Sequence, residues 1–284
     1  MKNKFILQST GFKTSYLEEI AKTLDRFNID WDDFGIIPSE NVITNLENIL
    51  IPNTRLIARG GTKFLNLLEK NGDLELLNSS LTVEQIKLKD FYLKELIKSI
   101  DYDIEKFDQA YYGKLNLPLL NSDAKYIPYK QLEYYTFEKE AFIKPSKDLK
   151  SFNGGIIYSD ETLLNYLYRT PHNMDVKDET IIVAPVKKIY SEYRFFMHKD
   201  YILGMSRYML NGEVAADTLV PEFMKDAVLE YSKLYHPADL YVIDLADTDN
   251  GVKIVEYNCW NASGFYNCDI QNIIGNINEI KSIC

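Results

Sequence analysis

The chain lacks a long apolar run. None of its 284 residues belongs to an uninterrupted apolar stretch of about 18 residues, the length that marks a membrane-spanning helix. The first apolar run ends at Gln8, which is too short for a signal peptide, and it is more typical of a first β-strand. We therefore expect no membrane attachment and a cytoplasmic protein.

Cysteine and histidine are scarce. The three cysteines, Cys259, Cys268 and Cys284, lie close to the C-terminal end, and the three histidines are scattered. An odd number of cysteines in an intracellular chain argues against a disulfide framework. The scattered histidines argue against zinc, and no Ser-His-Asp or Cys-His set for nucleophilic catalysis is apparent. We expect the cysteines to be packing residues or a free thiol in the tail.

Positive charge is in deficit, with 32 Lys and Arg against 42 Asp and Glu and a net charge of −10. This balance argues against extended contact with a nucleic-acid backbone, although it does not exclude nucleic acid. It does not restrict small anions, because a phosphate site needs only a few lysines and arginines. The P-loop signature Gly-x-x-x-x-Gly-Lys-Ser/Thr is also missing.

Strand and helix patterns alternate in the N-terminal third. Residues 4–8 and 55–59 resemble buried strands, and residues 15–28 between them have the apolar spacing of an amphipathic helix. Further helices are expected at 62–69 and within 82–110, followed by a connector at 116–130 that contains prolines. These patterns predict a small α/β layer.

The pattern after the connector changes to strands joined by short turns. We expect a helix at 161–170 and a second one at 221–235 that begins with a proline. Buried strands are expected at 141–145 and 180–186, and two hairpins at 192–208 and 241–258.

The second hairpin ends in polar residues. A period of two places Val252, Ile254, Glu256 and Asn258 on one strand face, and the turn brings Asp244 opposite Glu256. Two adjacent carboxylates are costly to bury without a cation, and oxygen ligands of Asp, Glu and Asn suit Mg²⁺. The alternative is a solvated strand end where three polar residues meet by chance.

Cations and glycines occur upstream of this hairpin. Lys144 ends an apolar strand, and Lys147, Lys150, Gly154 and Gly155 follow it. Together they offer ammonium groups and exposed backbone N–H groups that could hold phosphate. A lysine at a strand end is otherwise simply solvated.

The first hairpin carries two arginines. Glu192 and Arg194 share a strand face with Phe196, and Arg207 lies across the hairpin. Arginines forked toward one pocket would bind a γ-phosphate or a substrate carboxylate in two places. The alternative is a surface ladder of Glu and Arg side chains.

These motifs, in this order, resemble the ATP-grasp superfamily. The stretches 142–145, 148–152, 191–196 and 256–266 are more specifically similar to its R2K clade, named for two arginines and a lysine and found mainly in bacteria and phages. The specific similarity covers roughly residues 140–270, and residues 59–65 fit less specifically.

The resemblance implies an α/β (α+β) ATP-grasp fold. A pre-ATP-grasp α/β domain at 1–120 would precede an ATP-grasp domain at 121–284. Within the latter, a lid subdomain at about 140–185 and a catalytic subdomain at about 186–284 would sandwich the nucleotide between two antiparallel sheets.

The resemblance also implies roles for individual residues. Asp244, Glu256 and Asn258 would hold one or two Mg²⁺ ions, and Arg194 and Arg207 would stabilise the transferred phosphoryl group or hold the carboxylate. Glu192 would orient Arg194 or bind ribose. Phosphate and adenine would be held by Lys144, by Lys150 with the lid loop through Gly154 and Gly155, and by the backbone of Ala184, Pro185, Val186 and Lys187. The acceptor pocket would be lined by Asn261, Ser263 and Tyr266.

The reaction implied is the ligation of a carboxylate to an amine or a thiol through an acylphosphate, with release of ADP and phosphate. ATP and Mg²⁺ are the expected cofactors. The carboxylate and the acceptor could belong to an amino acid, a peptide or protein terminus, or a modified nucleotide. The alternatives are a kinase of the same fold and a nucleotide-binding module without catalysis. The resemblance leaves a homodimer open.

Overall fold

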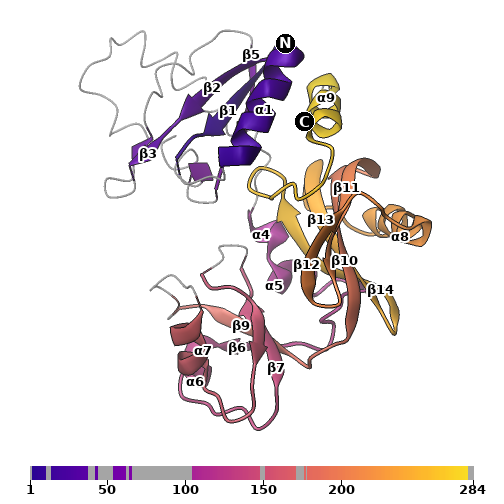
Figure 1. Cartoon of the computed structure of the whole chain (residues 1–284). Helices are drawn as coiled ribbons and strands as arrows, with labels where there is room; N and C mark the ends of the chain where they lie inside the picture. The colour runs from indigo at the N-terminus through magenta and orange to yellow at the C-terminus, as the bar shows by residue number, and fades with distance from the viewer. Residues whose placement is uncertain are drawn as a thin grey trace.

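The computed structural model describes residues 2–10, 14–37, 42–43, 54–61, 64–65, 104–147, 151–170, 176 and 178–280 (Figure 1). Lys150, Cys284 and His172 lie outside the described residues, as do most of the expected helix at 62–69 and residues 82–103. Among the described residues, no helix combines the length and the apolar character needed to cross a membrane.

A parallel three-stranded sheet forms the N-terminal layer. Its strands β1 (Lys2–Gln8), β2 (Asp30–Phe34) and β5 (Thr54–Arg59) are ordered β2-β1-β5, and helix α1 (Thr14–Arg26) connects β1 to β2. Ile20 and Leu24 of α1 are fully buried. The expected strands and helix are therefore confirmed. Two short strands, β3 (Ile36–Ile37) and β4 (Val42–Ile43), pair with each other beside this layer.

A connector joins this layer to the rest of the chain. Of the expected helices within 82–110, the structure describes only two short ones, α4 (Ile104–Phe107) and α5 (Gln109–Tyr112). The following segment docks on strand β14 (Gly251–Cys259), where Leu120 N–H donates to the Ile254 carbonyl and Ile254 N–H donates to the Pro118 carbonyl.

A four-stranded antiparallel sheet follows, ordered β6-β9-β7-β8. Its strands are β6 (Lys125–Pro128), β7 (Ala141–Pro145), β8 (Gly155–Ile157) and β9 (Thr180–Ala184). Helices α6 (Tyr129–Leu132) and α7 (Leu163–Arg169) pack on it around a separate apolar core. Thr162 caps α7 by accepting from the Asn165 N–H.

A five-stranded antiparallel sheet forms the C-terminal part, ordered β12-β11-β10-β13-β14. Its other strands are β10 (Ile189–His198), β11 (Tyr201–Leu210), β12 (Glu213–Asp217) and β13 (Leu240–Thr248). Both expected hairpins are confirmed. Helix α8 (Glu222–Ser232) packs on one face, and α9 (Ile270–Glu279) lies beside α1 (Figure 1).

One expectation about this sheet is wrong. A β-bulge shifts the register between β13 and β14, so that Leu245 pairs with Ile254 while Asp244 pairs with Glu256. Val255 is the extra residue, and it reverses the alternation at that point. Ile254 therefore packs in the core with Leu245, whereas Glu256 lies on the opposite face with Asp244.

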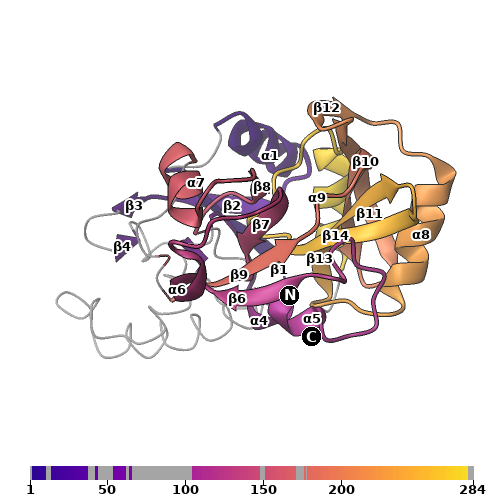
Figure 2. The same ribbon diagram turned by 90° about the horizontal axis from the view of Figure 1, so that it is seen from below.

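The two antiparallel sheets are joined by residues 185–188, which run from β9 to β10. Figure 2 shows the four-stranded and five-stranded sheets on either side of this short link. The end of β7 lies opposite the polar residues of β14, where Lys144 contacts Glu256.

Candidate functional site

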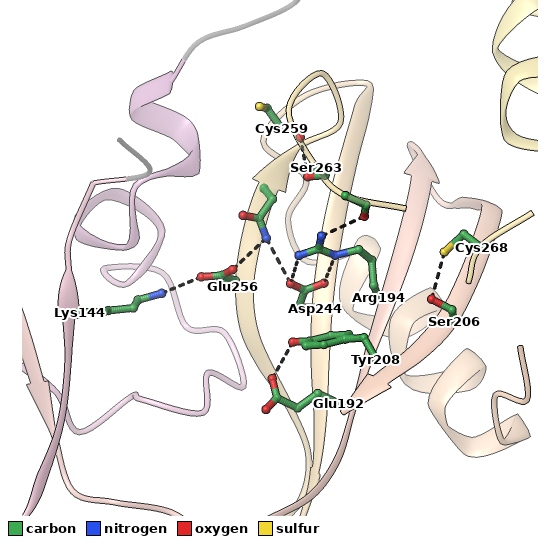
Figure 3. Close-up of polar contacts among 12 residues, drawn as sticks. Lys144, Glu192, Arg194, Ser206, Tyr208, Asp244, Glu256, Cys259, Ser263 and Cys268 are labelled. Atoms are coloured by element: carbon green, nitrogen blue, oxygen red, sulfur yellow. Dashed lines mark hydrogen bonds and ion pairs between the residues drawn. The ribbon is translucent and has the colours of Figure 1, made fainter. Parts of the chain in front are cut away.

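The centre of the candidate site is a buried ion pair between β10 and β13. Arg194 and Asp244 are register partners, with exposed fractions of 6% and 1%. Arg194 Nε donates to Asp244 Oδ1 at 2.8 Å and Nη2 donates to Oδ2 at 2.6 Å (Figure 3). Burial alone would lower the pKa of Arg194, but the charge and hydrogen bonds of Asp244 outweigh it and raise that pKa.

Glu256 and Asn258 complete this polar face from β14. Asn258 Nδ2 donates to Glu256 Oε1 at 3.1 Å and to Asp244 Oδ2 at 3.3 Å. Glu256 also accepts from Lys144 Nζ at 3.1 Å, and Lys144 comes from β7 of the other sheet (Figure 3). The ion pair of Lys144 and Glu256 thus connects the two antiparallel sheets at the site.

The side-chain oxygens of this polar face are of the type that binds Mg²⁺. Among the described residues, no group of three or more His, Cys, Asp or Glu could hold a metal ion. Asp244, Glu256 and Asn258 instead offer two carboxylates and one amide on a single face, and Mg²⁺ commonly uses few protein oxygens and completes its shell with water and phosphate. Arg194 and Lys144 at present balance the two carboxylates.

A cavity of about 200 Å³ opens between the sheets beside Lys144. Gln109 is one wall residue that the sequence pattern did not reveal; it is 2% exposed, and its Oε1 has no hydrogen-bond partner in the described part of the chain. The cavity is lined by Phe107, Gln109, Tyr112, Lys144, Pro145, Ser146, Lys147, Phe152, Asn153, Gly154, Glu256 and Tyr257.

The paired glycines are required by close packing. A Cβ at Gly154 would come within 2.8 Å of Lys144 Cβ, and a Cβ at Gly155 would come within 2.6 Å of the Tyr166 hydroxyl. Gly154 therefore allows the loop backbone to approach Lys144 closely. The contribution of Lys150 to a phosphate cradle stays a prediction.

The link between the sheets borders a second cavity of about 540 Å³. Val186 and Lys187 line it, and Lys187 Nζ lies 2.5 Å from Asp123 Oδ1 of the connector. Ala184 is buried at the end of β9, and Pro185 follows it. The adenine-binding role of this segment stays a prediction.

Tyr208, rather than Arg207, reaches the site from β11. The register places Arg207 opposite Tyr193 and Ser206 opposite Arg194, and Tyr208 is the extra residue of a β-bulge. Tyr208 Oη donates to Glu192 Oε2 at 2.6 Å. Burial raises the pKa of Glu192, and the hydrogen bond from Tyr208 lowers it. The effect of burial is larger, so the pKa is raised overall.

The expectation that Arg194 and Arg207 fork toward one pocket is therefore wrong. Arg207 Nη2 lies 3.1 Å from Asp217 Oδ2, and its Nε donates to the Ala215 carbonyl at 3.3 Å, both on β12. Because consecutive strand residues alternate between faces, a register that turns Ser206 and Tyr208 toward Arg194 turns Arg207 away.

Hydrogen bonds from its own side chains hold the turn after β14. Asn261 and Ser263 are 2% and 4% exposed, and their side chains donate to the carbonyls of Ala58 and Cys259. Both side chains hold the turn in place, and their part in an acceptor pocket stays a prediction. Arg59, a buried residue of β5, also donates to the carbonyls of Trp260 and Ser263. Burial lowers the pKa of Arg59 to about 9.

Tyr266 is the member of the expected acceptor set that faces the site. Its ring stacks on Tyr208 with centroids 4.8 Å apart, and Arg194 lies 4.9 Å from its centroid. Its backbone φ of 50° is in the left-handed region, which is unusual for a residue other than glycine. The surrounding fold holds this ring at the end of the turn.

A family model for the ATP-grasp domain, R2K clade family 2, matches residues 125–275, which contain the polar face and the Lys144 strand. The chain belongs to this family. The expected membership of the R2K clade is confirmed. A search of curated proteins finds no significant match to this R2K-clade chain.

Solved ATP-grasp enzymes share the fold of the R2K-clade chain. The ATP-grasp ligase PsnB, complexed with minimal precursor, has a TM-score of 0.56 at 9% identity, covering 99% of each chain. D-alanine–D-alanine ligase from Bacillus anthracis has a TM-score of 0.53 at 12% identity, covering 98% of this chain and 92% of its own. A RiPP-associated ATP-grasp ligase from Chryseobacterium gregarium, in complex with ADP and a leader and core peptide, has a TM-score of 0.51 at 10% identity, covering 99% and 98%. The expected ATP-grasp fold is confirmed.

Proposed function

We propose that this chain is an ATP- and Mg²⁺-dependent ligase that joins a carboxylate to an amine, or to a thiol, through an acylphosphate. The observation that carries the proposal is the Lys144–Glu256 contact, which sets a cation of one sheet against a carboxylate of the other beside the buried Arg194–Asp244 pair. Membership of an ATP-grasp family supports nucleotide as the ligand between these sheets.

The nucleotide would lie along the cleft in a fixed order. The backbone of residues 184–187 would bind the base, and Lys144 and Lys147 would attract the phosphates, with Gly154 allowing close approach of the loop. Asp244, Glu256 and Asn258 would hold Mg²⁺, which would supply positive charge to the phosphates. Arg194 would fix the Asp244 carboxylate, because both oxygens of that carboxylate accept from its guanidinium.

The chemistry proceeds in two displacements. An oxygen of the substrate carboxylate attacks the γ-phosphorus and ADP leaves, which gives an acylphosphate. The amine nitrogen then attacks the acyl carbon, loses its proton, and phosphate leaves. The share of the protein is positioning and stabilisation of charge, since no side-chain nucleophile is needed.

A peptide is the substrate class that the solved relatives favour. PsnB is described with precursor peptide and AMPPNP, and with minimal precursor, Mg and ADP. The Chryseobacterium enzyme is described with a leader and core peptide. We extend this to the chain as a proposal, with a peptide carboxylate or terminus as the group to be activated. The catalytic role predicted for Arg207 is not part of the proposal.

The alternatives differ in their products. A kinase of the same fold would transfer the phosphoryl group to a stable acceptor and would need no amine. A nucleotide-binding module would bind ADP without turnover. In neither alternative is an oxygen of the substrate carboxylate transferred to the released phosphate.

The deciding experiment supplies ATP, Mg²⁺, a panel of amino acids and peptides with ¹⁸O-labelled carboxylates, and hydroxylamine as a general nucleophile. We expect ADP release together with a hydroxamate product, and ¹⁸O in the released phosphate. Glu256→Gln should abolish both signals. A stable phosphorylated product without hydroxamate would establish the kinase instead, and nucleotide binding without any ADP release would leave the binding module.

A further inference from the structure

Gln109 lies on the short helix α5, between the two antiparallel sheets (Figure 1). Its backbone N–H donates to the Ser146 carbonyl at 3.1 Å, and its own carbonyl accepts from the Tyr126 hydroxyl at 3.1 Å. Tyr126 belongs to β6 and Ser146 directly follows β7, so both bonds fix α5 to the four-stranded sheet. Tyr112, also on α5, packs its ring 5.0 Å from that of Tyr257 on β14. The helix is therefore fixed to both sheets, and Gln109 has a defined place between them.

The side-chain oxygen of Gln109 faces a cavity without a partner of its own. The residue is 2% exposed and lines the cavity of about 200 Å³, and Oε1 accepts no hydrogen bond from the residues that the structure describes. A buried acceptor left unpaired costs free energy, and most buried polar atoms in proteins have a partner. A leucine would pack at this position without that cost. The unpaired oxygen therefore indicates a ligand that donates a hydrogen bond.

The position of Gln109 along the cleft indicates which part of the reaction it serves. Strand β7 leads away from the link between the sheets, since its residue Phe142 pairs with Ala184 at the link and Lys144 lies two residues further on. The contact of Gln109 with Ser146 lies further still, past the end of β7. A nucleotide with its base at the link and its phosphates near Lys144 would have its terminal phosphate toward Gln109, and with it the acyl group.

An amine is the donor that suits this oxygen. Phosphate oxygens are acceptors, so they do not pair with Oε1, whereas each N–H of an amine donates. Lys144 and Lys147 line the same cavity, and neighbouring positive charge disfavours the ammonium form of a bound amine. The neutral form, which is the nucleophile, is thereby favoured. A thiolate has no proton to donate, so the same oxygen disfavours it.

We propose that Gln109 binds the acceptor amine of the ligation, with its side-chain oxygen accepting a hydrogen bond from the amine N–H. This inference rests on the proposed function, and it assigns the acceptor site and an amine rather than a thiol. The nitrogen lone pair stays free to form the C–N bond as the C–O bond to phosphate breaks, and the released proton goes to solvent.

The rest of the cavity limits the kind of amine. Phe107, Pro145 and Phe152 contribute apolar walls, which fit a slim alkyl stem. The ligand class is therefore a primary amine on an unbranched chain. It would enter from the α5 side, and not from the turn after β14 that the sequence predicts to line the acceptor pocket.

Steady-state kinetics with hydroxylamine and methylamine as acceptors test the inference, with ATP, Mg²⁺ and a carboxylate that supports ADP release. Gln109→Leu removes the oxygen at similar volume, and we expect it to raise the KM for both amines about fivefold or more, as for the loss of one hydrogen bond. The KM for ATP should stay unchanged. Gln109→Glu keeps an acceptor oxygen beside Lys144 and Lys147 and should hold the KM for both amines within about threefold of the wild type.

Gln131→Leu is the matched control, because Gln131 is an exposed residue of the short helix α6. Its KM values for ATP and for both amines should equal those of the wild type. An unchanged amine KM in Gln109→Leu, or an equal rise in the KM values of amine and ATP, would overturn the amine site. Weaker ATP binding in Gln109→Glu would show that the amide donates to phosphate, which also overturns it.

A thiol acceptor separates the remaining outcomes. Product formed with 2-mercaptoethanol but with neither amine would overturn the assignment of an amine. Failure of the wild type to release ADP with any carboxylate would instead overturn the proposed function.

Discussion

The two antiparallel sheets differ in how deeply their ion pairs are buried. In the four-stranded sheet and its helices, the ion pair of Lys130 and Asp178 lies at the surface, with side chains 73% and 91% exposed. In the five-stranded sheet the pair of Arg194 and Asp244 is almost fully buried. Exposed pairs contribute little, whereas buried ones need full compensation for lost hydration. Charge buried across the centre of a sheet is therefore better explained by chemistry than by stability.

The same contrast appears in the cores. The four-stranded sheet packs α6 and α7 on an apolar cluster around Ile143, Ile157 and Ile181. The five-stranded sheet packs α8 on one face with Met224 and Val228, and gives part of the other face to Arg194, Asp244 and Asn258. One sheet is stabilised on its buried face, while the other divides its buried surface between packing and a polar site.

Removing one member of the buried pair should have the largest effect. Asp244→Asn leaves the Arg194 charge buried without its partner, and we expect a loss of roughly 3–5 kcal/mol in the free energy of unfolding. The double variant Arg194→Met with Asp244→Leu should regain most of that stability and remain inactive. Lys130→Met, at the exposed pair, should cost less than about 1 kcal/mol.

Urea unfolding measures all three variants. Equal losses of unfolding free energy for Asp244→Asn and Lys130→Met would contradict the contrast between the two sheets, because the buried pair would then contribute no more than a surface one. Activity in the double variant would show that the pair serves stability alone.

Glu256→Gln tests a partly exposed residue at the edge of the polar face, for comparison with the buried Arg194–Asp244 pair. Glu256 holds Lys144 of the other sheet, yet its side chain is 33% exposed, so its loss should cost little stability. We expect ADP release to fall about 100-fold or more while the melting temperature stays nearly constant. Glu222→Gln is the control, because Glu222 pairs with Lys225 at 2.8 Å on α8. A lower melting temperature with activity retained would make Glu256 structural.

The two arginines of the β10–β11 hairpin give a smaller contrast. Arg194→Lys loses the two-point contact with Asp244 and should reduce ADP release by about 10-fold or more. Arg207→Lys retains a cation beside Asp217 and should change activity by less than about threefold. Steady-state rates decide between them. A larger effect at Arg207 would favour the role that the sequence predicts for it over the one that the register indicates.

Two glutamates should give opposite pH effects of smaller size. Burial raises the pKa of Glu192, so the stability that its protonated form contributes is lost as pH rises through that pKa. Glu192→Gln should therefore be more stable than the wild type at neutral pH and similar to it in acid, where the carboxyl is protonated.

Glu161 has the opposite shift. The hydrogen bond from Arg169 lowers the pKa of Glu161, so its stabilisation is present at neutral pH and is lost as pH falls through that lowered pKa. Glu161→Gln should be less stable than the wild type at pH about 7, and the difference should disappear in acid. Thermal unfolding at several pH values checks both, and shifts of the same sign would contradict the electrostatic account.

Much of the polar face could be predicted from sequence because a tight hairpin determines its own pairing. The turn before Gly251 brings Asp244 within one residue of Glu256 on the partner strand, and the apolar strand before Lys144 places that lysine at a strand end. The order of the motifs along the chain then indicates the fold, since few folds combine these strands and loops in that order.

The remaining features depend on irregularities that periodicity cannot reveal. The bulge at Val255 separates Ile254 from Glu256, and the bulge at Leu203 shifts β11 so that Arg207 pairs with Tyr193 and leaves the face of Arg194. The burial of Asn261 and Ser263 depends on contacts with β5, about 200 residues earlier in the chain. Gln109 lies in a segment of generic helical composition, where no local signal marks a cavity residue.

Nucleotide binding with and without Mg²⁺ tests the central claim most directly. The melting temperature of the wild type and of Glu256→Gln is measured with ADP, each with and without Mg²⁺. A ligand at 100 times its dissociation constant adds about 2.7 kcal/mol of stability. The account predicts a Mg²⁺-dependent stabilisation of the wild type that is lost in Glu256→Gln. Equal stabilisation of both proteins, or none in either at millimolar ADP, would contradict it.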